Sequence, residues 1–280
     1  MIAFRVDAPI DNLDSLGIIA GNRDLPLLLA REARAAGIPR LVAAAFEKET
    51  DPALTELVDE IEWLRVGQLS SLIKAFQKHH ITQCVMVGQI APKNLFDLRP
   101  DLRAVKLLAT LKEKNAHSIF GGIADELAAE GITLIEATPW LQPAMPGVGF
   151  AMGPAPCEEQ SSDIAFGHQL AKEVSRLEIG QTVVVKNGTV LAVEGFEGTD
   201  ACLQRGGKLA GKDGDATAVK VAKAEHDLRF DIPCLGPRTL ETCAAAGIGA
   251  LAFEAGRTLL LEADEVKSLA DKHRIAVTAV

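Results

Sequence analysis

Charged side chains alternate with apolar ones along the segment His226–Pro233, whose sequence is HDLRFDIP. If this segment is extended, a period of two residues places Asp227, Arg229 and Asp231 on one face and the apolar side chains on the other. Two carboxylates that flank a guanidinium can hold a metal ion, bind a phosphate and orient a water molecule, which are the tasks of phosphoryl chemistry. The same pattern also fits a half-buried edge strand whose polar face meets solvent. The pattern alone leaves both interpretations open.

A second group of carboxylates lies in the segment Glu194–Asp200, EGFEGTD, which ends a predicted strand and enters a helix through Gly198. Thr199 or Asp200 can cap that helix, and capping alone would explain the pattern. A functional interpretation makes Glu197 and Asp200 oxygen ligands of a hard cation such as Mg²⁺, with the free N–H groups of the turn facing phosphate. The spacing alone favours the cap.

Two glycine-containing segments come near to nucleotide-binding loops without matching them. The first, GIIAGNRDLP, lacks the GxGxxG spacing, although a turn at Gly21 and Asn22 can contact one nucleotide at the end of the first strand. A plain tight turn is the alternative. The second, Gly206–Asp213, nearly matches a P-loop, but Asp213 replaces the metal-binding hydroxyl and no buried strand precedes it. We interpret this second segment as a flexible, partly basic lid or surface loop.

The elements that must position these residues alternate along the first half of the chain, where short apolar runs are separated by amphipathic stretches. The predicted strands are 16–20, 41–46, 61–66, 83–88 and 133–136. The predicted helices are 25–37, 51–59, 69–79, 101–113 and 118–130. This order favours an α/β domain with a doubly wound, Rossmann-like parallel sheet and right-handed crossovers.

The composition changes between residues 138 and 160, where prolines and glycines disfavour a helix or a central strand. We therefore predict an amino-terminal Rossmann-like domain over 1–137, a linker over 138–160 and a mixed α/β catalytic domain over 161–280. Within that last domain, the β-rich runs 182–186 and 189–194 flank Asn187-Gly188, the pair that a type I′ hairpin turn requires because both residues need φ > 0. Further helices are predicted at 161–176, 199–205, 238–246 and 264–272, and extended segments at 216–223, 227–233, 250–253, 258–261 and 275–280.

Charge and cysteine content exclude several classes of protein. The 280 residues include 29 Lys plus Arg and 38 Asp plus Glu, a net charge of −9 that disfavours binding to nucleic acid. Five cysteines form no CxxC pair, so the pattern indicates neither a disulfide framework nor a zinc cluster and fits a reducing cytoplasm. No apolar run reaches the roughly 18 to 20 residues that span a bilayer.

Longer stretches of the sequence resemble one known family. Three segments in order resemble the carboxy-terminal domain of the LpxI family. They are DIAFGHQLAKEVSRLEIGQTVVVKNGTVLAVEGFEGTDACLQRGG, VKVAKAEHDLRFDIPCLGPRTLE and FEAGRTLLLE. LGIIAGNRDLP and the segment Gly88–Phe96 resemble its amino-terminal domain. The resemblance implies a UDP-2,3-diacylglucosamine pyrophosphatase of lipid A synthesis. Such an enzyme forms UMP and the lipid monosaccharide phosphate, with water directed at the α-phosphorus and with divalent metal support.

The resemblance also assigns residues, because the aspartate of its RFDxP motif falls on Asp231, the expected general base or activator of a metal-linked water. Arg229 would then stabilise phosphate oxygens, and Asp227 and Lys223 are further catalytic candidates on the same segment. The predicted substrate-binding residues are Gly21, Asn22, Gly88, Gln89, Gly198 and Thr199. The predicted ligands of Mg²⁺, or of a similar divalent cation, are Asp231, Glu197 and Asp200. We expect the side chains of RFD and EGTD to converge on one site.

The expected partner is therefore the UDP-diacylglucosamine lipid substrate, in a cytoplasmic protein. Peripheral contact with the cytoplasmic face of the inner membrane and a homodimer are left open. Two other functions are also left open. One is a non-catalytic carrier that binds the UDP-lipid. The other is a nucleotide-dependent oxidoreductase, against which the missing dinucleotide fingerprint argues.

Overall fold

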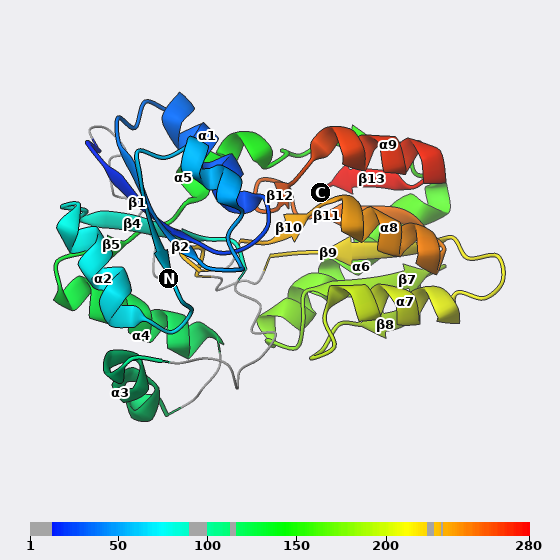
Figure 1. Cartoon of the computed structure of the whole chain (residues 1–280). Coiled ribbons are helices and arrows are strands. Elements are labelled where there is room, and N and C mark those ends of the chain that lie inside the picture. Colours follow the sequence, from blue (N-terminus) through cyan, green and yellow to red (C-terminus); the bar gives the residue numbers. More distant parts are fainter. Residues whose placement is uncertain (1–12, 90–99, 113–115, 223–226, 231) are drawn as a thin grey trace. The chain divides into compact units, whose positions relative to one another are not determined.

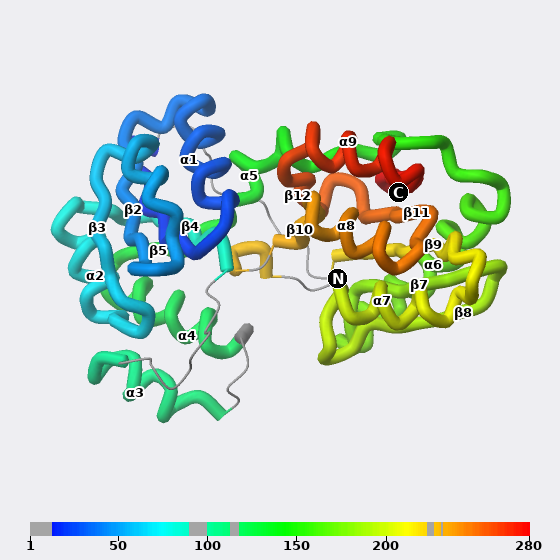
Figure 2. The backbone as a smooth tube through the Cα atoms, turned by 45° about the vertical axis from the view of Figure 1, so that its right-hand side comes forward, coloured from blue at the N-terminus to red at the C-terminus, as the bar shows by residue number. Residues whose placement is uncertain are grey.

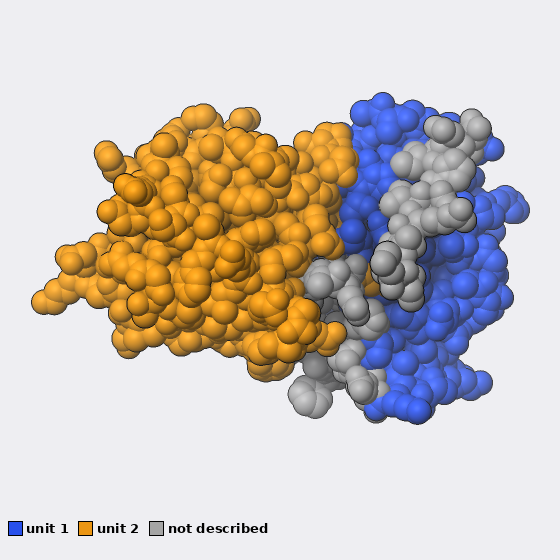
Figure 3. Space-filling view, turned by 180° about the vertical axis from the view of Figure 1, so that it is seen from behind, with its two compact units in different colours: residues 1–141, 228–230 blue, residues 142–227, 231–280 orange. Residues whose placement is uncertain are grey.

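The computed structural model describes residues 13–89, 100–112, 116–222, 227–230 and 232–280. The chain forms two compact units, residues 1–141 with 228–230 and residues 142–227 with 231–280 (Figure 3). Both units are α/β, as the sequence predicts, with a parallel sheet in the first and a mixed sheet in the second. The predicted linker is divided between them: α5 (Thr138–Leu141) belongs to the first unit, and β6 (Ala151–Met152) belongs to the second.

The first unit is built on a five-stranded sheet (Figure 1). Its strands are β1 (Leu16–Ala20), β2 (Leu41–Phe46), β3 (Glu60–Leu64), β4 (Gln83–Val87) and β5 (Thr133–Leu134). They are all parallel and follow the order β3-β2-β1-β4-β5. The chain adds strands outward on one side of β1 and then returns to β4 on the other side. This reversal is the switch point of a doubly wound fold, so the predicted Rossmann-like sheet is confirmed.

Helices cover both faces of this sheet (Figure 2). They are α1 (Leu25–Ala35), α2 (Leu69–Lys78), α3 (Leu102–Thr110) and α4 (Ala116–Ala129). Buried side chains of α2, α3 and α4, among them Phe76, Leu107 and Leu127, form one core with the sheet. Helix α1 lies with α5 and contacts β4. The helix predicted over 51–59 is shorter than expected, since only the 3₁₀ turn η1 (Pro52–Glu56) forms there.

The second unit contains a six-stranded mixed sheet and a separate two-stranded pair. The large sheet has the order β6-β13-β11-β9-β7-β8, with β7 (Thr182–Lys186), β8 (Thr189–Val193), β9 (Ala216–Lys220), β11 (Ile248–Phe253) and β13 (Ala276–Ala279). The pair is β10 (Cys234–Leu235) and β12 (Leu259–Leu260). The predicted β7–β8 hairpin is confirmed, because Asn187 and Gly188 have φ of 50° and 69°. The carboxylate of Asp163 accepts from both of their N–H groups, at 2.8 and 2.7 Å.

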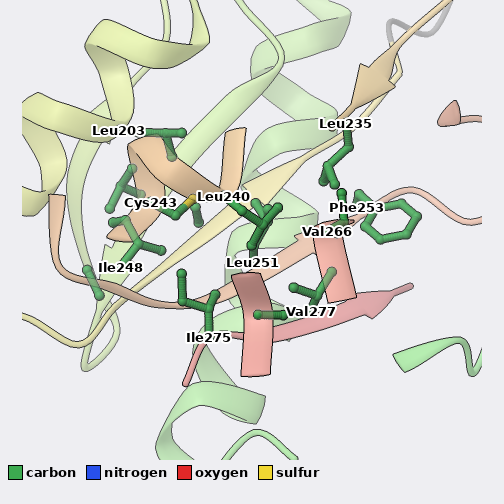
Figure 4. Packing of buried hydrophobic residues seen from close by; sticks show 14 of the residues in the cluster. Leu203, Leu235, Leu240, Cys243, Ile248, Leu251, Phe253, Val266, Ile275 and Val277 are labelled. Carbon is green, nitrogen blue, oxygen red and sulfur yellow. The ribbon is translucent and has the colours of Figure 1, made fainter. Parts of the chain in front are cut away.

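One helix covers one face of the large sheet and three cover the other. Helix α6 (Glu158–Arg176) lies on the first face, and α7 (Thr199–Leu209), α8 (Pro237–Ala246) and α9 (Ala263–His273) lie on the second. Figure 4 shows the core beneath these three helices, where Leu203, Leu240 and Val266 pack with Leu251 of the sheet. Among the described residues, no helix combines the length and hydropathy that a bilayer span needs.

The prediction of a flexible loop from Gly206 onward is wrong in its first four residues, because α7 continues to Leu209. The two glycines are packing positions. A Cβ added to Gly206 would lie 2.5 Å from Cβ of Val184, and one added to Gly207 would overlap the carbonyl oxygen of Ala246 in α8. Small residues here let α7 approach both the sheet and α8 closely.

Gly207→Ala is therefore expected to destabilise the second unit by about 1–3 kcal/mol, the usual cost of overpacking. Alanine has the higher helix propensity, by about 1 kcal/mol, so propensity alone predicts a change of the opposite sign. The shift of the urea unfolding midpoint measures which effect dominates. Gly147→Ala is the matched control, since a Cβ at Gly147 meets no atom within 4 Å. An unchanged or higher midpoint for Gly207→Ala would contradict this account of the packing.

Candidate functional site

Two short loops meet at the switch point of the first unit. Gly21 and Asn22 follow β1, and Gly88 and Gln89 follow β4, the two strands between which the strand order reverses. The N–H of Asn22 donates to the carbonyl oxygen of Gln89 at 2.6 Å, and the N–H of Gly21 donates to that of Val87 at 2.8 Å. Open α/β sheets bind ligands just outside this point. We call these four residues the switch-point loops.

Glycine is required on both sides of this contact. A Cβ on Gly21 would lie 2.5 Å from the carbonyl oxygen of Gln89. Gly88 has a φ of +85°, and a Cβ there would lie 2.7 Å from the carbonyl oxygen of Asn22. The two loops therefore touch through their backbones, which keeps their positions at the sheet edge fixed relative to each other.

The amide side chain of Asn22 faces two different environments. Its Nδ2 group donates to Oε2 of Glu49 at 2.8 Å, whereas its Oδ1 atom is buried and has no hydrogen-bond partner among the described residues. Thr50, next to Glu49, donates from Oγ1 to the carbonyl oxygen of Ala20 at 2.5 Å and so ties the end of β2 to the end of β1. The Oδ1 atom can accept from an N–H or O–H group of a ligand. Sequence reasoning missed Glu49 and Thr50, whose signal was their place in the turn that follows the buried strand β2.

The carboxylates of the EGTD motif are paired with arginines. Glu197 forms an ion pair with Arg205 and accepts from the N–H of Gly195 at 3.1 Å. The hydrogen bond from Arg205 holds the pKa of the Glu197 carboxyl below its usual value. Asp200 lies 2.9 Å from a guanidinium nitrogen of Arg238. As they are arranged here, these two carboxylates do not fit a magnesium site, because each already has a cationic partner.

The capping role predicted for Thr199 or Asp200 is wrong. The residue at the N-cap of α7 is Gly198, with φ of 83°, and among the described residues no side-chain hydrogen bond caps the helix there. The hydroxyl of Thr199 donates instead to the carboxylate of Glu194, at 3.2 and 3.3 Å from its two oxygens. This contact turns the first residue of α7 toward the end of β8 rather than toward its own helix.

A row of polar side chains lies at one end of three neighbouring strands of the second sheet, β9, β7 and β8. Thr182 is the register partner of Lys220, and the N–H of Glu194 donates to the carbonyl oxygen of Thr182. We call these three residues the strand-end row. All are buried, with exposed fractions of 6% for Glu194, 0% for Thr182 and 9% for Lys220. Sequence reasoning assigned no role to any of the three.

Glu254 holds the end of β9 in place, and the segment that contains Lys223 follows this strand. Its N–H donates to the carbonyl oxygen of Lys220 at 3.0 Å, and its carboxylate accepts from the N–H of Ala222 at 2.8 Å. The same carboxylate forms an ion pair with Lys172 of α6 at 2.8 Å. Lys223 itself lies outside the described residues, so its catalytic role stays a prediction.

The extended conformation predicted for 227–233 is wrong, because Leu228–Phe230 form a turn. The Phe230 ring stacks on Phe120 of α4, with centroids 5.9 Å apart, and packs against the core of the first unit. The guanidinium of Arg229 lies 4.9 Å from the centroid of the Phe230 ring. The packing of this aromatic side chain is favoured over an extended strand at this place. Because the segment is not extended, the alternation of charged and apolar residues does not place Asp227, Arg229 and Asp231 on one face.

Asp231, like Lys223, lies outside the described residues, and Asp227 is half-buried. The convergence of the RFD and EGTD side chains therefore stays a prediction. Within the described part of the chain, no three His, Cys, Asp or Glu side chains gather as a metal site. Burial raises the pKa of the Cys84, Cys202 and Cys243 thiols to about 12, so these thiols are not ionised near neutral pH.

Comparisons with known proteins cover both units. Residues 15–144 match the LpxI N-terminal domain, and residues 147–278 match the LpxI C-terminal domain. A relative from Caulobacter vibrioides, named UDP-2,3-diacylglucosamine pyrophosphatase LpxI, is 30% identical over 274 residues, which are 95% of this chain and 97% of the relative.

Solved structures give only remote similarity. The biotin carboxylase subunit of pyruvate carboxylase is 13% identical, covers 66% of this chain and 36% of its own, and has a TM-score of 0.28. A biotin carboxylase complex with beta-gamma-ATP from Campylobacter jejuni is 11% identical, covers 71% and 42%, and has a TM-score of 0.29. TM-scores this low support no conclusion about this chain.

Proposed function

The chain belongs to the LpxI family, and from this premise we propose that it hydrolyses UDP-2,3-diacylglucosamine to UMP and 2,3-diacylglucosamine 1-phosphate. The observation that carries the proposal is the identity of 30% with a relative of that named activity, extending over 95% of the chain. Both domains of the family are matched, so the proposal concerns the whole reaction rather than one binding module.

We propose a single displacement without a covalent enzyme intermediate. The Asp231 carboxylate takes a proton from water as the water oxygen attacks the α-phosphorus. The bridging P–O bond breaks, and the sugar phosphate leaves with the electron pair. Arg229 donates to the phosphate oxygens on which negative charge accumulates. A positioned general base supplies about 10²- to 10⁴-fold of the rate.

We propose that the switch-point loops bind the nucleotide end of the substrate. The supporting observations are their place at the strand-order reversal and the buried Oδ1 atom of Asn22, which can accept a hydrogen bond from the ligand. The N–H groups of the turn at Gly198 and Thr199 are proposed to face phosphate. The acyl chains need an apolar surface, since each buried CH₂ contributes about 0.8 kcal/mol. Contact with the cytoplasmic face of the inner membrane would supply the lipid, and we propose it for that reason.

Divalent metal dependence is also a proposal. When bound, Mg²⁺ neutralises charge on a diphosphate and contributes several kcal/mol of stabilisation in such reactions. Arg205 and Arg238 already pair with Glu197 and Asp200, so we assign the metal no ligand set among these described residues and route no step through it.

The test is incubation with UDP-2,3-diacylglucosamine and Mg²⁺ in ¹⁸O-labelled water, followed by mass analysis of both products. We expect the label in UMP. Label in the sugar phosphate would overturn the attack on the α-phosphorus, and unhydrolysed substrate that stays bound would support the carrier function instead. A parallel reaction with EDTA tests the metal: we expect turnover to stop and to return on addition of Mg²⁺, and an unchanged rate would reject metal dependence.

A further inference from the structure

The strand-end row adjoins the buried apolar core on its face of the sheet. The residues two positions further into each strand on the same face are Ala192, Val184 and Ala218, and all three belong to the buried core under α7, α8 and α9. The row continues across the sheet to Phe253, which is also buried. A carboxylate and an ammonium group in this layer lose hydration, and that loss is unfavourable unless hydrogen bonds or an opposite charge compensate it.

The two opposite charges of the row do not neutralise each other. Among the ion pairs of the described residues, none joins Glu194 to Lys220. The Glu194 carboxylate accepts from the hydroxyl of Thr199, and Nζ of Lys220 donates to the carbonyl oxygen of Cys234 at 3.1 Å. An ammonium group has three N–H donors, and within the described part of the chain one of them is used in this contact, so Lys220 can donate to a ligand.

The surroundings of Lys220 are suited to an anion. Asp200 in the first turn of α7 pairs with Arg238 in the first turn of α8, so these two helix starts are neighbours. The amino-terminal ends of helices carry partial positive charge. Glu197 and Asp200 are each already paired with an arginine, which leaves the positive charge of Lys220 uncompensated by either of them.

We propose that Lys220 is a further catalytic residue, which donates a charge-assisted hydrogen bond to the diphosphate of the substrate. Glu194 and Thr199 are positioning residues that hold the start of α7 against the row. This inference rests on the proposed function for the identity of the substrate, but the diphosphate-binding role can be measured without turnover. The ligand class is a nucleoside diphosphate.

Lys220→Met is the central test, because methionine keeps an unbranched chain and removes the charge. Lys186→Met is the matched control: Lys186 lies in the same sheet and also donates to carbonyl oxygens, those of Ala210 at 3.0 Å and Gly214 at 2.6 Å. We expect Lys220→Met to lower kcat/KM about 10²-fold, the effect of removing one donor to a developing charge. We expect it to weaken UDP binding, measured by calorimetry, at least tenfold. Lys186→Met should leave both quantities within about twofold of the wild type.

Equal losses in the two variants, or an unchanged UDP affinity in Lys220→Met, would overturn the inference. If the wild type binds UDP through Lys220 but does not hydrolyse the UDP-lipid, the proposed function fails, while the diphosphate-binding role of Lys220 stands. A measurement on the wild type avoids dependence on the folding of the variant. Lysine ¹³Cε resonances of the wild type, assigned with the help of the two lysine variants, should shift for Lys220 on addition of UDP and stay in place for Lys186. An unshifted Lys220 resonance at saturating UDP would also reject the inference.

Discussion

Asp231→Asn is expected to lower kcat by about 10²- to 10⁴-fold, because asparagine cannot accept the proton that the proposed general base removes from water. The amide has nearly the same size as the carboxyl group, so the unfolding midpoint should stay close to that of the wild type. Steady-state hydrolysis of UDP-2,3-diacylglucosamine measures the effect. KM should change little, since the base acts on water rather than on the bound substrate.

Asp213→Asn is the control for this substitution, because Asp213 is exposed and lies in the turn after α7. It removes the same charge from the chain and should leave kcat unchanged. A rate near that of the wild type in Asp231→Asn would exclude the assigned role. Loss of the folded state in that variant would instead indicate a structural carboxylate.

Gly21→Val is expected to separate the switch-point loops, because its side chain would occupy the space of the Gln89 and Gly88 backbones. Overpacking of this kind costs about 1–3 kcal/mol. Loss of the hydrogen bond from Asn22 to Gln89 adds about 1 kcal/mol. We expect a lower unfolding midpoint of the first unit and a KM at least tenfold higher, since the proposed nucleotide site lies at these loops.

The measurements are urea unfolding and the KM for the UDP-lipid. Gly121→Ala is the control in the same unit, because a Cβ there meets no atom within 4 Å and alanine favours the helix. A normal KM in a folded Gly21→Val protein would show that the nucleotide binds elsewhere.

Prediction from the sequence succeeded where local residues decide the structure. The β7–β8 hairpin follows from Asn187-Gly188, because few other pairs adopt two successive positive φ angles. The parallel order of the first sheet follows from alternating apolar runs and helices, together with the handedness of their connections. In both cases the sequence pattern that predicts the structure is local, although the strands that pair in the first sheet, such as β1 and β4, are far apart along the chain.

Prediction failed where a distant contact determined the local conformation. The alternation in 227–233 indicated a strand, but Leu228–Phe230 form a turn in which Phe230 packs on Phe120. Gly206 and Gly207 suggested a flexible loop, but they lie in α7, where Val184 and Ala246 leave no room for side chains. The partners in these contacts are far away in sequence, so no local pattern could have indicated them.

The sequence by itself determined the α/β class, the doubly wound order of the first unit and the glycines at which its loops turn. It also provided the resemblance to the LpxI family, which the matches to both LpxI domains confirm. Only the tertiary structure showed that Glu194, Thr182 and Lys220 form one buried row. The physical reason is that cross-strand register brings together residues from three separate strands. Burial then raises the free-energy cost of the charges on Glu194 and Lys220.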